Sequence, residues 1–206
     1  GSFVIDTVSE LTGGLDSASN SGDKTDKLTN FNKPTFSGTA EEGSEITLKI
    51  NEKEYQLTVG ADKTWSITLP ESDKLDDDTY QYTILATDRA GNTSKIENEV
   101  TIDTVVELTA NMTTDTGYSP TDGKTQEKNP SWSGTMEVGA AISITVNNKT
   151  YDSKSGITVN QDGTWSFTLP AEDALSDGDY LWVVNITDDA GNENKVSKIL
   201  TVDTTA

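Results

Sequence analysis

Short runs of alternating apolar and polar residues dominate the chain, and Gly, Asn and Asp residues separate them. An alternation of period two is typical of strands with one buried face, because successive side chains of a strand point to opposite sides. Turn residues at this spacing also favour strands over helices. In the first half of the chain the pattern predicts seven strands, at residues 4–11, 34–39, 45–50, 55–59, 64–69, 80–87 and 95–102.

The pattern occurs twice, because segments of the first half return in the second. The recurring segments are Thr64–Pro70 with Thr164–Pro170, Ser37–Thr39 with Ser133–Thr135, and Ala90–Asn92 with Ala190–Asn192. An Asp-Thr pair also begins at Asp6, Asp103 and Asp203. Self-similarity at a fixed period indicates repeated structural units. It predicts one domain at residues 1–103 and a second at 104–203, with 204–206 beginning a linker to a following repeat.

Each repeat has the strand content of a small sandwich. Seven short strands in about 100 residues are typical of an immunoglobulin-like (Ig-like) fold. Tyr80 and Tyr180 each follow an acidic turn, which is the position of a tyrosine corner at the start of strand F. The chain has no cysteine, so no disulfide can stabilise these small cores. We expect an all-β protein with two tandem Ig-like β-sandwich domains of about seven strands each, arranged as a rod.

Charge narrows the range of partners. The chain has 35 acidic and 15 basic residues, a net charge of −20 and no histidine. Such a charge disfavours nucleic acid and anionic membranes as partners, and no apolar run is long enough to span a bilayer. We expect a monomer that binds no nucleic acid and does not insert into a membrane.

Four motifs resemble those of a known family: Phe36–Glu41, Thr64–Pro70, Ala86–Asn92 and the pair Asp103-Thr104. They resemble the bacterial Ig-like repeats of giant adhesins that Gram-negative bacteria export by type I secretion. The likeness covers nearly the whole chain. It implies a secreted or cell-surface location, a part in host-cell attachment, and calcium as cofactor. Family members often have proline soon after the Asp-Thr pair, whereas Val-Ser and Val-Val follow it here.

The loops of a sandwich lie at its two ends, and this gathers acidic residues from distant parts of the sequence. At the N-terminal ends of the two domains we expect two groups: Asp6, Glu41 and Asp88; and Asp103, Glu137 and Asp188. Two carboxylates 4 Å apart repel by about 1 kcal/mol in water. Calcium removes this repulsion and accepts six to eight oxygen ligands in flexible geometry. Zinc fits less well without His or Cys ligands. The alternative is that these acids are solvated turn residues.

A long segment without strand character follows the first predicted strand of each domain. An ordered loop of this length is uncommon unless it is functional or held by a ligand. The resembling family carries calcium here, which implies Asp26 and Asp122 as ligands, with Asp23 and Asp115 behind them. The alternative is a mobile loop. Neither segment fits the EF-hand pattern.

Each of the four tryptophans could either pack in the core or stack on a sugar. Trp65 and Trp165 alternate with apolar residues and are expected in the core, as is Trp132, which stands where the first repeat has Phe36. The residue we would choose for stacking on a glycan is Trp182.

Three functions are compared. The leading one is a calcium-rigidified stalk unit that holds a receptor-binding tip away from the cell. Its partners would be neighbouring repeats of the same chain and, through the full-length protein, a host glycan or receptor. The second is a carbohydrate-binding module. The third, a glycosidase, needs two carboxyl groups at a fixed separation in a cleft, and small sandwiches offer no deep cleft. We therefore expect no enzyme activity.

Overall fold

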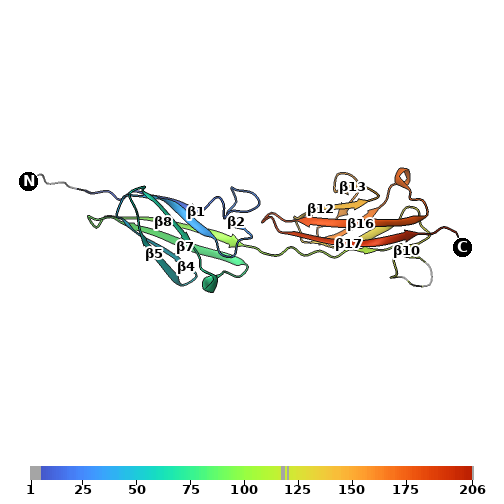
Figure 1. The fold of residues 1–206 in the computed structure, drawn as a ribbon, viewed down its shortest axis with the longest axis horizontal. Coiled ribbons are helices and arrows are strands. Elements are labelled where there is room, and N and C mark those ends of the chain that lie inside the picture. The colour runs from blue at the N-terminus through green and yellow to red at the C-terminus, as the bar shows by residue number, and fades with distance from the viewer. Residues whose placement is uncertain (1–5, 117–118, 120, 206) are drawn as a thin grey trace, which may run out of the picture. The chain divides into compact units, whose positions relative to one another are not determined.

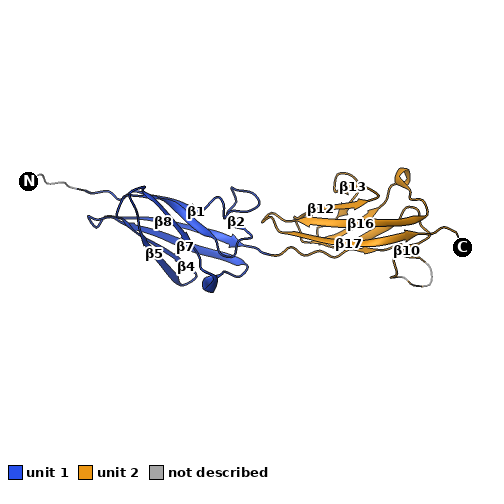
Figure 2. Cartoon of the chain, in the orientation of Figure 1, with its two compact units in different colours: residues 1–104 blue, residues 105–206 orange. Residues whose placement is uncertain are grey.

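The computed structural model describes residues 6–116, 119 and 121–205, and the chain forms two compact units. Unit 1 comprises residues 1–104 and unit 2 comprises residues 105–206 (Figure 2). Each unit is a pair of β-sheets, so the prediction of an all-β chain with two tandem Ig-like sandwiches is confirmed. In the described part of the chain no helix has the length and apolar character that crossing a membrane requires.

Unit 1 contains a five-stranded and a three-stranded sheet (Figure 1). The larger sheet has the order β2 (Leu28–Thr29), β8 (Thr93–Ile102), β7 (Asp78–Thr87), β4 (Glu45–Ile50) and β5 (Lys53–Thr58). The smaller has the order β1 (Leu11–Leu15), β3 (Thr35–Ala40) and β6 (Thr64–Thr68). A short 3-10 helix, η1 (Glu71–Asp73), connects β6 to β7. All pairs are antiparallel except β2 with β8.

Unit 2 repeats this plan with small additions. Its five-stranded sheet has the order β10 (Lys124–Thr125), β17 (Glu193–Val202), β16 (Gly178–Thr187), β12 (Ala141–Val146) and β13 (Lys149–Asp152). Its second sheet has the order β14 (Thr158–Val159), β15 (Thr164–Thr168), β11 (Ser131–Thr135) and β9 (Asn111–Met112). The 3-10 helix η2 (Ala171–Asp173) corresponds to η1.

Six of the seven strands predicted for the first repeat are confirmed to within two residues at each end. The first prediction, residues 4–11, is wrong: β1 begins at Leu11, and residues 4 and 5 lie outside the described residues. The glycines of β1 pair with β3, where a Cβ on Gly38 would lie 2.0 Å from the Thr12 carbonyl oxygen. Only glycine permits this close approach of two backbones.

The core of each unit lies between its two sheets. Trp65 and Trp165 are 3% and 1% exposed, which confirms their predicted core positions. Trp132 is fully buried and lies at the position of the equally buried Phe36. Burying a large aromatic side chain contributes about 1.5 to 3 kcal/mol, so these rings stabilise the sandwich that positions the loops.

The tyrosine corners are confirmed in both units. The Tyr80 hydroxyl donates to the Asp76 carbonyl oxygen at 3.1 Å, and the Tyr180 hydroxyl donates to the Ser176 carbonyl oxygen at 3.1 Å. Each bond joins the start of a long central strand to the loop before it.

Candidate metal centre

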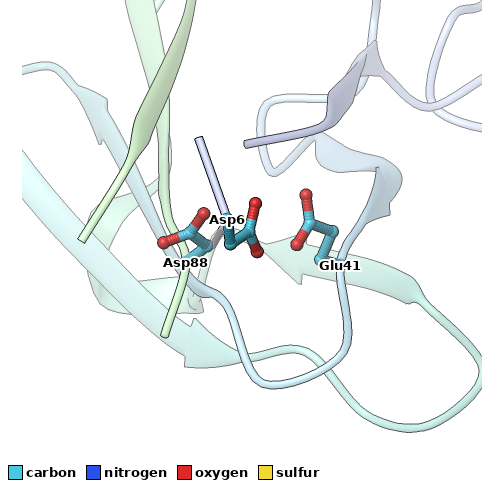
Figure 3. A group of neighbouring side chains, drawn as sticks. All are labelled: Asp6, Glu41 and Asp88. Carbon is cyan, nitrogen blue, oxygen red and sulfur yellow. The ribbon is translucent and has the colours of Figure 1, made fainter. Parts of the chain in front are cut away.

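Three carboxylates converge at one end of unit 1. Asp6 precedes β1, Glu41 follows β3 and Asp88 follows β7, so three separate segments supply them (Figure 3). One oxygen from each residue lies within 4.8 Å of the oxygens from the other two. The structure thus brings these three predicted residues together, and their role as metal ligands stays a prediction.

Asp88 is held rigidly by the turn between β7 and β8. Its side chain accepts hydrogen bonds from the backbone N–H groups of Ala90 and Asn92 and from the Asn92 side-chain amide, each at 2.8 Å. Asp88 is buried, and burial alone raises the pKa of its carboxyl. The hydrogen bonds from Asn92, Ala90 and Gly91 outweigh this effect, so the pKa lies below the ordinary aspartate value. Asp88 is therefore an anion near neutral pH.

Hydrogen bonds also position the other two carboxylates. The Asn92 amide nitrogen donates to the Asp6 carbonyl oxygen at 3.2 Å, which ties the segment before β1 to the turn that holds Asp88. The Glu10 N–H donates to Glu41 Oε1 at 3.0 Å. A few residues after Glu41, Gly43 has a φ of +81°, and a Cβ there would lie 2.1 Å from Arg89 Nε. This turn therefore requires glycine.

Within the described residues, no ion pair neutralises the charges of the cluster. Among the described residues the ion pairs are Lys33–Glu71, Lys49–Glu54, Lys53–Asp73, Lys95–Glu97 and Lys149–Asp173. None of them includes Asp6, Glu41 or Asp88. Three close carboxylates repel one another, and a divalent cation is the simplest group that reverses the sign of that interaction.

Unit 2 repeats the turn that carries the buried aspartate. Asp188 accepts hydrogen bonds from the backbone N–H and the side-chain amide of Asn192, both at 2.8 Å. Glu137 follows β11, as Glu41 follows β3. Asp103, the counterpart of Asp6, is the second-last residue of unit 1. The meeting of Asp103 with Glu137 and Asp188 stays a prediction.

Three of the four acids predicted in the long segments hold a local turn, and Asp115 bonds across its segment instead. Asp23 accepts from the backbone and hydroxyl of Thr25, and Asp26 accepts from the Leu28 N–H. In unit 2, Asp115 accepts from the Gly123 N–H and Asp122 from the Lys124 N–H. Within the described ranges none of the four belongs to a group of three converging carboxylates. Their role as calcium ligands also stays a prediction.

Among these four acids, one buried atom stands out. Asp115 Oδ1 is enclosed and makes no hydrogen bond within the part of the chain that the structure describes. A buried oxygen without a partner costs about 1 to 3 kcal/mol, and Asp115 is the one of the four whose unpartnered acceptor is buried.

Asp16 was not singled out from the sequence, yet it organises the first of these segments. Its carboxylate accepts from the Ser37 hydroxyl at 2.5 Å and from the Ala18 N–H at 2.8 Å. The bond from Ser37 is the main reason why the pKa of Asp16 is lowered. The only sequence signal was an aspartate ahead of small polar residues, which is typical of many turns.

The choice of Trp182 for glycan stacking is corrected by the structure. Trp182 is 2% exposed, and its ring lies 6.0 Å from that of Trp132 in the core of unit 2. A sugar needs an open ring face to stack on. The alternation along β16 turns Trp182 inward, and Leu181 outward instead.

The chain matches a described family twice. The bacterial Ig-like domain family matches residues 7–104 and again residues 105–204. No curated protein matches the chain significantly.

Among solved structures, the chain is similar to a tetra-tandem repeat from the extending region of a large adhesion protein. The two are 23% identical, the match covers 96% of this chain and 50% of that chain, and the TM-score is 0.42. It is also similar to a Ca²⁺-stabilised adhesin that helps an Antarctic bacterium reach out and bind ice, with 26% identity, 95% and 50% covered, and a TM-score of 0.44. The chain spans half the length of each. A variant of three Ig domains of titin shares the fold, with 16% identity, 85% and 61% covered, and a TM-score of 0.50.

Nearly all of the sequence lies within the two family matches, and each match coincides with one compact sandwich. The chain therefore belongs to the bacterial Ig-like domain family, of which it carries two copies in tandem.

Proposed function

We propose that this chain is a calcium-rigidified repeat unit of a giant bacterial adhesin and serves as a stalk spacer in attachment to host cells. The observation that carries the proposal is the convergence of Asp6, Glu41 and Asp88 without an ion-pair partner among the described residues. Bound calcium would join three segments of the chain, including the one that enters the unit.

The donor set fits calcium. All three side chains offer carboxylate oxygens, which are hard ligands, and the chain has neither His nor Cys to favour a softer metal. Calcium accepts ligands from loops in flexible geometry and completes its shell with carbonyl oxygens and water. Extracellular modules bind calcium at about 0.1 to 1 mM, so the site would fill outside the cell and stay empty in the cytosol.

The repeat extends the proposal to the junction between the units. Asp103, Glu137 and Asp188 are the counterparts of Asp6, Glu41 and Asp88. Because Asp103 belongs to unit 1 and the other two belong to unit 2, an ion held by all three would restrain bending at the junction. Residues 204–206 would begin the same kind of linker to a following repeat.

A second class of calcium site belongs to the long segments, with Asp26 and Asp122 as ligands and Asp23 and Asp115 beside them. The free buried oxygen of Asp115 supports this for unit 2. Ions there would stiffen each unit internally rather than the junction.

The parent protein would be secreted or displayed on the bacterial surface after type I secretion, and the motifs resemble those of the large Salmonella adhesin SiiE. Neighbouring repeats would be the direct partners, and host glycans or receptors would bind through other parts of the full-length protein. The role proposed is mechanical rather than enzymatic.

Removal of calcium tests the proposal. The 206-residue chain is heated in calcium and in excess chelator, and its X-ray scattering is recorded in both. We expect a higher melting temperature and a narrower distribution of maximum dimensions in calcium. Identical melting curves and scattering profiles would exclude calcium as the stiffening agent.

A further inference from the structure

The residue after the buried aspartate carries opposite charges in the two units. Asp88 and Asp188 occupy the same position, in the turn after the long strands β7 and β16. The next residue is Arg89 in unit 1 and Asp189 in unit 2, and both are exposed. Arg89 is the only arginine in the sequence. A cation in unit 1 is thus exchanged for an anion in unit 2.

The Arg89 side chain lies over the turn that follows Glu41. A Cβ on Gly43 would lie 2.1 Å from Arg89 Nε and 2.5 Å from its Cζ, so the guanidinium rests on the Gly43 backbone. Neighbouring Cα atoms are about 3.8 Å apart, which places the guanidinium within about 11 Å of the Glu41 Cα. Beyond its neighbours in sequence, a Cβ on the counterpart Gly139 would meet no atom of the described chain within 4 Å. The cation seated on this turn in unit 1 therefore has no equivalent among the described residues of unit 2.

Apart from this exchange, the charges around the two turns are equal in sum. The positions charged in one unit alone are Glu42, Glu45 and Lys63 of unit 1, where unit 2 has Val138, Ala141 and Gly163, and Glu193 of unit 2, where unit 1 has Thr93. Each unit thus gains one negative charge from them. The exchange of Arg89 for Asp189 then makes this end of unit 2 more negative than that of unit 1 by two charges.

Arg89 acts on the carboxylate cluster through space. Among the described residues it forms no ion pair, so it does not occupy a carboxylate oxygen that a metal ion needs. The Debye length is about 8 Å at physiological ionic strength and about 30 Å at about 0.01 M salt. A charge at about 10 Å is therefore felt strongly at low salt and weakly at physiological salt.

We propose that the residue after the buried aspartate sets the calcium affinity of its unit. Arg89 weakens binding at the cluster of Asp6, Glu41 and Asp88 (Figure 3), and Asp189 strengthens it at the corresponding cluster of unit 2. A divalent cation interacts with a nearby charge twice as strongly as a monovalent one does, so one exposed side chain is enough to change the affinity. The inference rests on the calcium site proposed above and adds a residue that tunes it without being a ligand.

Calcium titrations followed by NMR test the inference. The Asn92 N–H donates to Asp88 Oδ1 and the Asn192 N–H donates to Asp188 Oδ1, each at 2.8 Å, so each amide reports on its own cluster. The 206-residue chain and its variants are titrated in about 10 mM and in about 0.15 M salt.

Charge reversal at either position should shift the calcium Kd of its own unit. Arg89→Asp should lower the Kd read at Asn92 about five- to tenfold at low salt and about twofold at about 0.15 M salt. Asp189→Arg should raise the Kd read at Asn192 by the same factors. Arg89→Gln, which only removes the charge, should fall between the wild type and Arg89→Asp.

Controls separate the effect of charge from that of packing. Lys74→Asp makes the same change of charge just after η1, at the other end of the ten-residue strand β7 and about 30 Å from the Asp88 turn. It should leave the Asn92 titration unchanged. Loss of the contact between Arg89 and Gly43 would act equally at both salt concentrations, whereas an effect of charge shrinks as salt rises. Thermal unfolding in chelator confirms that each variant is folded.

The outcomes distinguish this inference from the proposed function. If neither amide responds to calcium, the proposed function fails and the inference fails with it. If both amides respond but neither Kd moves on charge reversal, or if the shifts are the same at both salt concentrations, the inference alone is overturned.

Discussion

Replacing Glu41 with Gln should stabilise unit 1 in chelator, and calcium should cancel most or all of that advantage. The substitution removes one negative charge but keeps the oxygen that accepts the Glu10 N–H, so the turn after β3 is retained. In chelator the variant loses only repulsion. In calcium it loses a ligand as well.

The changes in unfolding free energy in chelator and in calcium can be worked out from the distances in the cluster. Glu41 has two carboxylate neighbours within 4.8 Å, and each repulsion amounts to about 1 kcal/mol in a water-like medium or about 3 at an effective dielectric near 20. Glu41 is partly exposed, so the lower value applies and the variant should be stabilised in chelator by about 1 to 2 kcal/mol. Calcium at ten to a hundred times its Kd stabilises the wild type by about 1.4 to 2.7 kcal/mol, and the variant forfeits most of this.

The assay is calorimetric unfolding at low salt in excess chelator and in about 10 mM calcium. A change of 1 kcal/mol shifts the melting temperature of a domain this size by about 4 to 8 °C. Glu42→Gln is the matched control, because Glu42 is exposed and lies outside the cluster. The reasoning is refuted if the Glu41 variant shifts the transition equally in both conditions, or no differently from the Glu42 variant.

Two further predictions concern the sandwich itself. Burial and the hydrogen bond to Asp73 raise the pKa of Tyr55 to about 12 from an ordinary 10. The neutral Tyr55 hydroxyl therefore stabilises the fold fully below pH 10, and this stabilisation is lost as the pH rises toward 12. Ultraviolet titration of wild type and Tyr55→Phe measures the pKa, and an ordinary tyrosine value would contradict the prediction. Trp165→Phe should destabilise unit 2 by about 1 kcal/mol more than Trp132→Phe. The reason is that Trp165 Nε1 donates to the Thr109 carbonyl oxygen at 3.1 Å, while Trp132 Nε1 has no partner in the described chain. Equal losses of stability in denaturant unfolding would show that the hydrogen bond contributes nothing.

Much of the fold follows from local pattern, because alternation and turn residues act over a few neighbours. The strand Glu45–Ile50 agrees with its prediction at both ends. The strand Leu11–Leu15 could not be foreseen, since its glycines acquire a purpose only when Gly38 and the Trp65 ring lie against them. That contact joins residues distant in sequence, and periodicity carries no information about it.

The candidate site was predictable for a different reason. Once the sandwich is assumed, the direction of each strand decides which loops share an end, and this brings Asp6, Glu41 and Asp88 together. The bonds that fix the site depend on side-chain geometry that topology does not specify. The ring of Trp182 was misjudged because the strand's register, and not its composition, decides which residues face the core.

The central claim is that calcium binds among Asp6, Glu41 and Asp88. Anomalous X-ray scattering from crystals grown in about 10 mM calcium tests it most directly. We predict a strong anomalous peak within bonding distance of one oxygen from each of the three carboxylates, absent after soaking in chelator. Ordered water or a lysine ammonium between these carboxylates, with no anomalous signal, would contradict the account.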